Sequence, residues 1–407
     1  MRSAAPRVLS ALARRHPGQF DLCEDAVQDA IARAHATWAA GDVQDRAPDD
    51  VEAWLYVAAR NRRVDLIRSD TARRERERRY ASEVEASPPG LGVSERDDSL
   101  TLLFLCCHPA LSEASQVALT LRSVGGLSTA EIAAAFLVPE TTMAQRIGRA
   151  KQRLADSGAT FGSVGPDERA ARMAAVRSVL YAVFSEGHAA TVGADLIRTD
   201  LCHEGIRLTR LLHALAPADR ETASLLALML LTDARRPARV TADGDPVPLD
   251  EQDRRRWNRD AIAEGAALLR CALGAGPAGA YAIQAAIAAI HCEAPSAQET
   301  DWPQIAALYV LLAKVAPSPM VTLNQIVALA MVDGAPVALA RLDELARDPG
   351  VGGHHRVRAV RAHLLERAGR IPEAVDEYRA AARAATNLPE RRYLLRKAAE
   401  LATNVIP

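Results

Sequence analysis

Apolar residues recur at helical spacing in the first part of the chain. Between residues 20 and 39 their spacing follows the period of a helix, which places them on one face. These residues are Leu22, Val27, Ala30, Ile31, Ala34 and Trp38. The other face is polar and carries Glu24, Asp25, Gln28, Asp29 and Arg33. The pattern predicts an amphipathic helix with one buried face.

A second helix is expected from about residue 49 to beyond Arg68, after a polar loop at residues 41–50. Gly41 and Pro48 act as helix breakers in that loop. The apolar positions of the second helix are Trp54, Leu55, Val57, Ala58, Val64, Leu66 and Ile67. Arginine residues are concentrated toward the end of this segment, and the acidic residues there neutralise only part of their positive charge. The stretch from Arg73 to Arg79 alternates with Glu75 and Glu77, a pattern typical of a solvated helix face.

A compact pattern over residues 112–154 predicts a helix-turn-helix. Gly125 and Gly126 end one helix, as glycine commonly does at a C-terminus. Ser128 stands three residues before Glu131, the spacing of a capping box at the start of a short helix. Pro139 then opens a last helix. Its expected buried stripe is Met143, Ile147, Ala150 and Leu154.

The exposed side of this last helix suits the major groove of DNA. Short polar groups and Gln precede Arg and Lys along it, so that the former reach base edges and the latter lie on phosphates. The side chains in question are Glu140, Thr141, Thr142, Gln145, Arg146, Arg149, Lys151 and Arg153. An ordinary helical hairpin with a solvated basic face would show the same spacing, so the pattern alone leaves both interpretations open.

Breaks in composition divide the chain into five parts. We expect domains at 1–79 and 100–156, linkers at 80–99 and 157–168, and a helical extension at 169–407. The first linker contains Ser-Pro-Pro-Gly-Leu-Gly and scattered acids, which have little to bury. In the extension, residues 354–387 look like a tetratricopeptide repeat, with a fainter copy at 324–345. The small and large residues that would pack its two helices are Ala362, Gly369, Ala374, Tyr378 and Ala381. Such helix pairs stack and commonly bind peptides or proteins.

The composition favours an all-α fold. Only 4% of the 407 residues are aromatic, Ala, Leu and Arg abound, and no segment alternates as a strand would. The formal net charge of −1 is unlike that of a protein that holds DNA by bulk charge alone. Any attachment to phosphates must therefore come from local clusters of arginine.

The cysteines and histidines give little support to a metal site or an enzyme. None of the 6 Cys forms a CxxC pair, so we expect reduced thiols in the cytoplasm, with Cys106 and Cys107 filling a core. Neighbouring Cys and His residues on a helix point about 100° apart and rarely share an ion. No phosphate loop and no GxSxG turn is present. We expect no metal, no cofactor, no catalysis and no membrane span.

Three separated segments together resemble the extracytoplasmic-function class of sigma factors. They are CEDAVQDAIARA (23–34), AWLYVAARNRRVDLIR (53–68) and LSTAEIAAAFLVPETTMAQRIGRAKQRL (127–154). Residues 105–146, 179–190, 201–212 and 241–265 look like a subgroup with a long helical C-terminal extension. The resemblance therefore covers nearly the whole chain. It implies two small helical sigma domains, regions 2 and 4, followed by helical hairpins.

The resemblance also implies roles for particular residues. Asp25, Gln28, Asp29 and Arg33 match the surface for the clamp helices of RNA polymerase. Arg60, Asn61, Arg62, Arg63 and Arg68 match the part that engages the promoter −10 element. Residues 41–50 match the loop that captures a flipped base, although this loop is longer than usual. Glu140, Thr141, Thr142, Gln145, Arg146 and Arg149 match the −35 recognition helix.

Two departures and two alternatives qualify this interpretation. Pro139 and Ala144 replace polar residues common in the family, so −35 contacts would depend on Gln145, Arg146 and Arg149. Little sequence precedes Arg7, so we expect a short first helix. The resemblance implies that the extension helps control activity in place of a separate membrane-bound inhibitor. Its repeats would offer a site for a protein or peptide partner. The alternatives are a stand-alone helix-turn-helix regulator with a helical sensor domain and an interaction scaffold inert toward DNA.

Overall fold

The structure, a computed structural model, is helical throughout its described part. It describes residues 4–39, 50–77, 99–136, 138–159, 166–190, 193–274, 276–348, 351 and 354–403. Within these ranges no residues form a strand, and only isolated bridges such as Val240 with Pro246 occur. The expected all-α fold is confirmed. The expected base-capturing loop, apart from Asp50, and nearly all of the first linker lie outside the described residues, as does much of the second linker.

The chain divides into two compact units, Met1–Ala182 and Val183–Pro407. The division falls inside one helix, α8 (Pro166–His188). Arg172 on α8 donates from Nη1 to the carbonyl oxygen of Phe104 over 3.1 Å, and Met173 and Val176 are buried. The first unit therefore includes the first turns of α8, which begin inside the second expected linker, residues 157–168.

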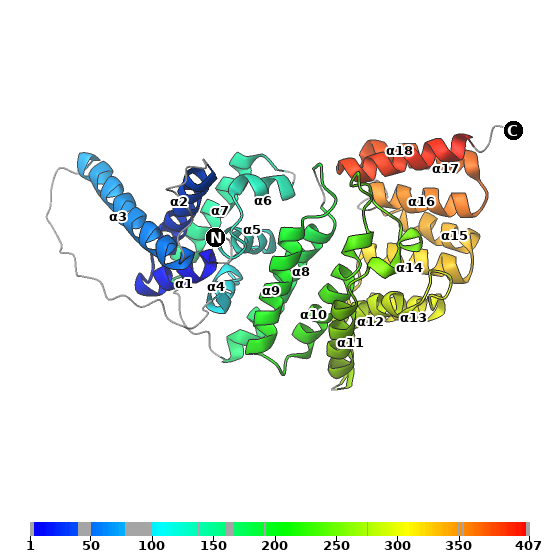
Figure 1. Ribbon diagram of the computed structural model, residues 1–407, viewed down its shortest axis with the longest axis horizontal. Helices are drawn as coiled ribbons and strands as arrows, with labels where there is room; N and C mark the ends of the chain where they lie inside the picture. The colour runs from blue at the N-terminus through cyan, green and yellow to red at the C-terminus, as the bar shows by residue number, and fades with distance from the viewer. Residues whose placement is uncertain are drawn as a thin grey trace. The chain divides into compact units, whose positions relative to one another are not determined.

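Three helices open the first unit. They are α1 (Ala5–Arg15), α2 (Phe20–Ala39) and α3 (Val51–Glu77), which appear in the blue part of Figure 1. The apolar face of α2 is buried at Val27, Ala30, Ile31 and Ala34, as the spacing predicts. Leu55 and Ala59 of α3 are buried as well. This packing fixes which side chains of α2 and α3 face outward.

The second half of the first unit contains the predicted helix-turn-helix. Its elements are α4 (Ser99–Cys106), α5 (Glu113–Ser123), α6 (Thr129–Ala135) and α7 (Glu140–Asp156). On α7 the buried residues are Met143, Ile147, Ala150 and Leu154, which confirms the predicted stripe. Cys106 and Cys107 are also buried, as expected for cysteines that fill a core. Burial raises the pKa of the Cys107 thiol to about 12, so this thiol stays protonated.

The second unit begins with tightly packed helices. After α8 come α9 (Thr199–Leu215), α10 (Arg220–Asp233), α11 (Arg259–Gly274) and α12 (Ala280–Glu293). A Cβ built on Gly187 would lie 2.6 Å from the Cys202 backbone nitrogen, so α8 and α9 meet where only glycine fits. Between α10 and α11, residues 234–258 form an irregular segment with three short 3₁₀ turns, Arg236–Ala238, Leu249–Glu251 and Arg254–Arg256.

Helical hairpins complete the second unit. They comprise α13 (Trp302–Val315), α14 (Pro319–Val332), α15 (Ala335–Leu345), α16 (His355–Arg367), α17 (Ile371–Ala384) and α18 (Leu388–Thr403). They follow one another from yellow to red in Figure 1. The helix pair α16–α17 turns at Gly369 and buries Ala362, Ala374 and Tyr378, as the repeat pattern predicts. The fainter pair is α14–α15, which turns at Gly334.

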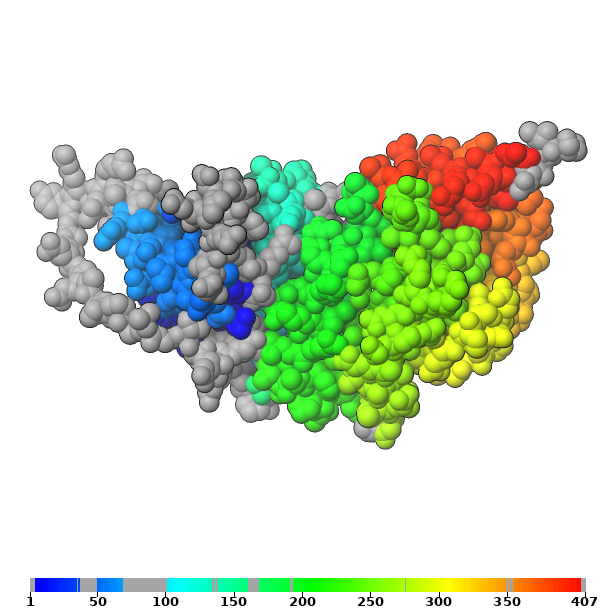
Figure 2. All heavy atoms as spheres, viewed as in Figure 1, coloured from blue at the N-terminus to red at the C-terminus, as the bar shows by residue number. Residues whose placement is uncertain are grey.

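Contacts across the hairpins tie the irregular segment to the last helix. Asp245 pairs with Arg392 at 2.8 Å and with Arg396 at 3.1 Å, both on α18. Figure 2 shows this part of the segment in yellow-green against the red surface of α18. No helix in the described ranges is long and apolar enough to cross a membrane.

Candidate nucleic-acid interface

The local geometry of the helix-turn-helix follows from its caps. Ser128 Oγ accepts a hydrogen bond from the Glu131 backbone nitrogen at 3.2 Å, and the Glu131 carboxylate accepts from the Ser128 backbone nitrogen at 2.8 Å. This is the predicted capping box, and it satisfies amides that the start of α6 leaves unbonded. Gly126 has φ +63°, and the Leu127 nitrogen donates to the Leu121 carbonyl at 3.0 Å, which ends α5.

The α7 face opposite the buried stripe is open to solvent. Glu140, Thr141, Gln145 and Arg149 are exposed, and Thr142 and Arg146 are half-buried. Arg149 Nε donates to the Gln145 carbonyl oxygen over 3.3 Å, so the two residues are neighbours on this face. The structure therefore brings together the side chains expected to read the −35 element.

The residues expected at the −10 element, all on α3, differ in exposure and in their bonding partners. Asn61 and Arg68 are exposed and Arg60 is half-buried. Arg62 Nε pairs with Asp29 of α2 at 2.6 Å. Arg63 is only 9% exposed and donates from Nη1 to Gln19 at 2.7 Å. In this arrangement Arg63 lies inside the first unit, and Arg62 is bonded to a residue expected to bind polymerase.

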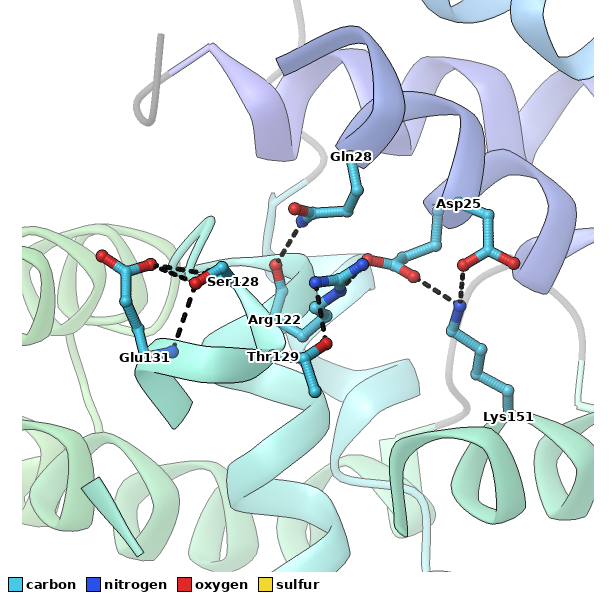
Figure 3. Close-up of polar contacts among 8 residues, drawn as sticks. Asp25, Gln28, Arg122, Ser128, Thr129, Glu131 and Lys151 are labelled. Carbon is cyan, nitrogen blue, oxygen red and sulfur yellow. Dashed lines mark hydrogen bonds and ion pairs between the residues drawn. The ribbon is translucent and has the colours of Figure 1, made fainter. Parts of the chain in front are cut away.

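The polar face of α2 contacts the helix-turn-helix directly. Glu24 is fully buried and pairs with Arg122 of α5 at 3.0 Å and with Lys151 of α7. Lys151 also bonds Asp25 at 2.6 Å. Gln28 donates to the Arg122 carbonyl oxygen over 2.9 Å. Figure 3 shows these side chains converging between α2 above and α5–α7 below. We call this set of five residues the α2 clasp.

The α2 clasp corrects two expectations drawn from periodicity. Glu24 was placed on a solvated face and Lys151 on a phosphate-binding face, yet their side chains are 0% and 10% exposed. Burial by itself would lower the pKa of Lys151, but Glu24 and Asp25 outweigh it and raise that pKa. Lys151 is therefore charged at neutral pH and compensates the buried carboxylate. Helical spacing carries no information about a second domain that covers a polar face.

Arg122 links the clasp to the recognition module. Its Nη1 donates to the Thr129 hydroxyl at 3.1 Å, in the first turn of α6, while its Nε bonds Glu24. No sequence pattern marks Arg122 as part of the site. An arginine in the last turn of α5 offers no signal by itself, because cations are common at helix C-termini.

Known proteins resemble this part of the chain. Residues 101–154 match the family described as sigma-70, region 4. A probable ECF RNA polymerase sigma factor, SigI, of Mycobacterium tuberculosis is 30% identical over 151 residues, which cover 36% of this chain and 50% of that protein. The chain therefore contains a sigma region 4 domain and is similar to an extracytoplasmic-function sigma factor. The family resemblance seen in the sequence is confirmed, and α5–α7 are the helix-turn-helix of sigma region 4.

The chain also carries a long C-terminal extension. Residues 172–273 match a family of unknown function, DUF6596, which spans most of α8 to α11. An uncharacterized protein of Rhizobium meliloti (strain 1021) is 40% identical over 404 residues, which cover 96% of this chain and 92% of that protein. The relative therefore shares the extension as well as the sigma regions. No solved structure matches the chain.

Proposed function

We propose that this sigma factor directs RNA polymerase to particular promoters and starts transcription there. The observation that carries the proposal is the open polar face of α7 on a sigma region 4 module. Thr141, Gln145 and Arg149 would enter the major groove of the −35 element, with Glu140, Thr142 and Arg146 beside them. The capping box supports this role, because it fixes α6, which packs against α7.

The second part of the proposal concerns α2 and α3. Asn61 and Arg68 are exposed and Arg60 is half-buried. We assign these three residues to the −10 element together with Arg62 and Arg63. Asp25, Gln28, Asp29 and Arg33 are assigned to polymerase. Since Asp29 pairs with Arg62, polymerase contact at Asp29 would release Arg62 toward DNA.

The α2 clasp implies a closed state of the free sigma factor. The bonds of Asp25 to Lys151 and of Gln28 to the Arg122 carbonyl would compete with bonds from these two side chains to polymerase. Sigma regions 2 and 4 would separate on binding, because the −10 and −35 elements are contacted by different regions. Polymerase binding would therefore compete with the clasp.

The direct test is run-off transcription with core RNA polymerase that lacks any sigma subunit. The full chain should yield specific transcripts from genomic fragments, and Gln145→Ala or Asn61→Ala should reduce them at least tenfold. Gln152→Ala, an exposed change elsewhere on α7, is the control and should leave them unchanged. Duplex binding without polymerase, combined with no transcripts, would favour a stand-alone regulator and refute the proposal.

The extension is proposed to regulate the sigma regions, with a protein or peptide partner as one means. Support comes from its size and from its presence in the Rhizobium relative. Deletion should follow His188, where α8 ends, because Arg172, Met173 and Val176 belong to the core of the first unit. Unchanged promoter output from residues 1–188 would exclude a regulatory role.

A further inference from the structure

The second unit contains a cavity that the sigma role does not use. It has a volume of about 550 Å³, within the ~300–1,000 Å³ range of small-molecule sites. Its walls come from the irregular segment before α11, the end of α12, and helices α13, α14 and α16. The part of the wall formed by the irregular segment lies within residues 241–265, which resemble the subgroup with a C-terminal extension. The proposed function gives these residues no role.

One side of the cavity is apolar and aromatic. Ile305 and Ala328 are buried there, and Val327, Met331 and Trp302 are half-buried around them. The Trp302 ring meets His291 edge to face, with centroids 5.2 Å apart. This side would favour the hydrocarbon or aromatic body of a ligand over water.

The other side offers a cation with unused donors. Arg254 Nη1 donates to the carbonyl oxygens of His291 and Ala294 at 2.6 and 2.7 Å, and the guanidinium lies 4.6 Å from the Trp257 ring centroid. These contacts hold the side chain in place. Its Nη2 is buried and has no hydrogen-bond partner among the described residues. A buried charged donor without an acceptor destabilises the fold, so an acceptor is expected there.

Neighbouring groups strengthen the preference for an anion. His291, which also lines the cavity, has a buried Nδ1 without a partner, and so does Nε of the nearby Arg235. Burial, together with Arg235 and Arg254, lowers the pKa of His291 to about 4, so its ring is neutral at pH 7 and can donate one hydrogen bond. Arg367 and Asp250 are exposed at the rim, where water screens their charges.

We propose that this cavity binds a small organic acid, with its anionic group on Arg254 and its apolar body against Ile305, Ala328 and Trp302. Arginine suits this task because its planar fork keeps free donors after two of its bonds are made. The site is independent of the proposed sigma function, since binding needs neither polymerase nor DNA.

Two dyes that share one body test the proposal on the full chain. 8-Anilinonaphthalene-1-sulfonate carries an anionic group, and N-phenyl-1-naphthylamine is the same molecule without it. Fluorescence titration should show one saturable sulfonate site that binds at least tenfold more tightly than the neutral dye. Decanoate should displace the sulfonate, and decan-1-ol should do so far less well.

Matched variants locate the site. Arg254→Gln should weaken sulfonate binding about tenfold and leave the neutral dye unchanged, whereas Arg255→Gln, a change to the exposed neighbour, should alter neither. Val327→Trp should fill the cavity and block both dyes. Circular dichroism checks folding; should Arg254→Gln fail to fold, Val327→Trp decides the location and the decanoate–decanol comparison decides the charge preference.

Several results would overturn the proposal. Equal affinities for the two dyes would remove the anionic preference, and unchanged binding in Val327→Trp would place the dyes elsewhere. Many weak sites would mean general adsorption to apolar surface. Displacement by an acidic peptide but not by decanoate would favour a protein partner in place of a small acid.

Discussion

Replacing Lys151 by Met should open the α2 clasp and tighten binding to core RNA polymerase. Lys151 is 10% exposed and neutralises Glu24, which is fully buried. The methionine keeps most of the apolar stem but leaves Glu24 with Arg122 alone. In the open state water solvates Glu24, so the substitution penalises the closed state selectively.

The contacts of Glu24 determine how strongly the substitution penalises the closed state. Removing one partner from a buried ion pair costs about 3–5 kcal/mol when nothing else compensates. Arg122 still bonds Glu24 at 3.0 Å, so we take about 2 kcal/mol, within the range for one hydrogen bond to a charged group. That corresponds to about 30-fold in the ratio of closed to open forms. Apparent affinity scales with the open fraction, so affinity should rise up to about 30-fold if the closed form dominates.

Fluorescence anisotropy can measure this affinity. Cys271 is the exposed cysteine of the described residues and belongs to the second unit, so a dye attached there leaves the clasp residues unmodified and reports binding. Arg153→Met, which removes an exposed charge two residues away on α7, is the matched control and should leave the affinity unchanged. Equal or weaker polymerase binding by Lys151→Met, with the fold intact, would refute competition between the clasp and polymerase.

Three further predictions concern stability. Gly187→Ala should destabilise the second unit by roughly 1–3 kcal/mol in urea denaturation, because its Cβ would meet the Cys202 backbone nitrogen at 2.6 Å; Gly274→Ala, with open space around it, should not. Ser128→Ala should cost about 1 kcal/mol through the lost cap and lower −35 duplex binding by the holoenzyme; an unchanged midpoint would contradict this. His291 has a folded pKa of about 4 against about 6.5 unfolded, so only the unfolded chain gains its proton between these values and stability falls as pH drops. Melting curves from pH 7.5 to 4.5 should show a smaller loss in His291→Asn than in wild type or in the exposed control His203→Asn.

The sequence allowed accurate prediction wherever one helix decided the outcome. The stripe from Met143 to Leu154 and the bond between Ser128 and Glu131 depend on spacings within a few residues, and both are confirmed. The same holds for the α16–α17 hairpin, where Gly369 adopts φ +72°. Local geometry of this kind is fixed by backbone hydrogen bonding and helical periodicity.

Prediction failed where polar groups pair over long sequence separations. Glu24 and Lys151 are 127 positions apart, and each belongs to a polar face by periodicity. Their burial follows from charge complementarity between two helices whose relative placement the pattern does not contain. The burial of Arg63 was missed for the same reason, because its bond to Gln19 depends on how α3 crosses the turn before α2. The role assigned to Arg63 at the −10 element remains a prediction.

The geometry of the clasp separates polymerase affinity from promoter choice. The clasp uses Lys151 on one side of α7, whereas Thr141, Gln145 and Arg149 are exposed. Weakening the clasp should therefore raise affinity for polymerase without changing which −35 sequences are preferred. Driving a 1:99 mixture of open and closed forms to 99:1 needs about 5.5 kcal/mol from the partner. The clasp consists of a few charge-assisted bonds, and desolvation cancels part of the free energy of each. The free energy of binding at one polymerase interface is therefore sufficient to open it. A clasp variant that changed −35 preference would show instead that α2 shapes the reading surface itself.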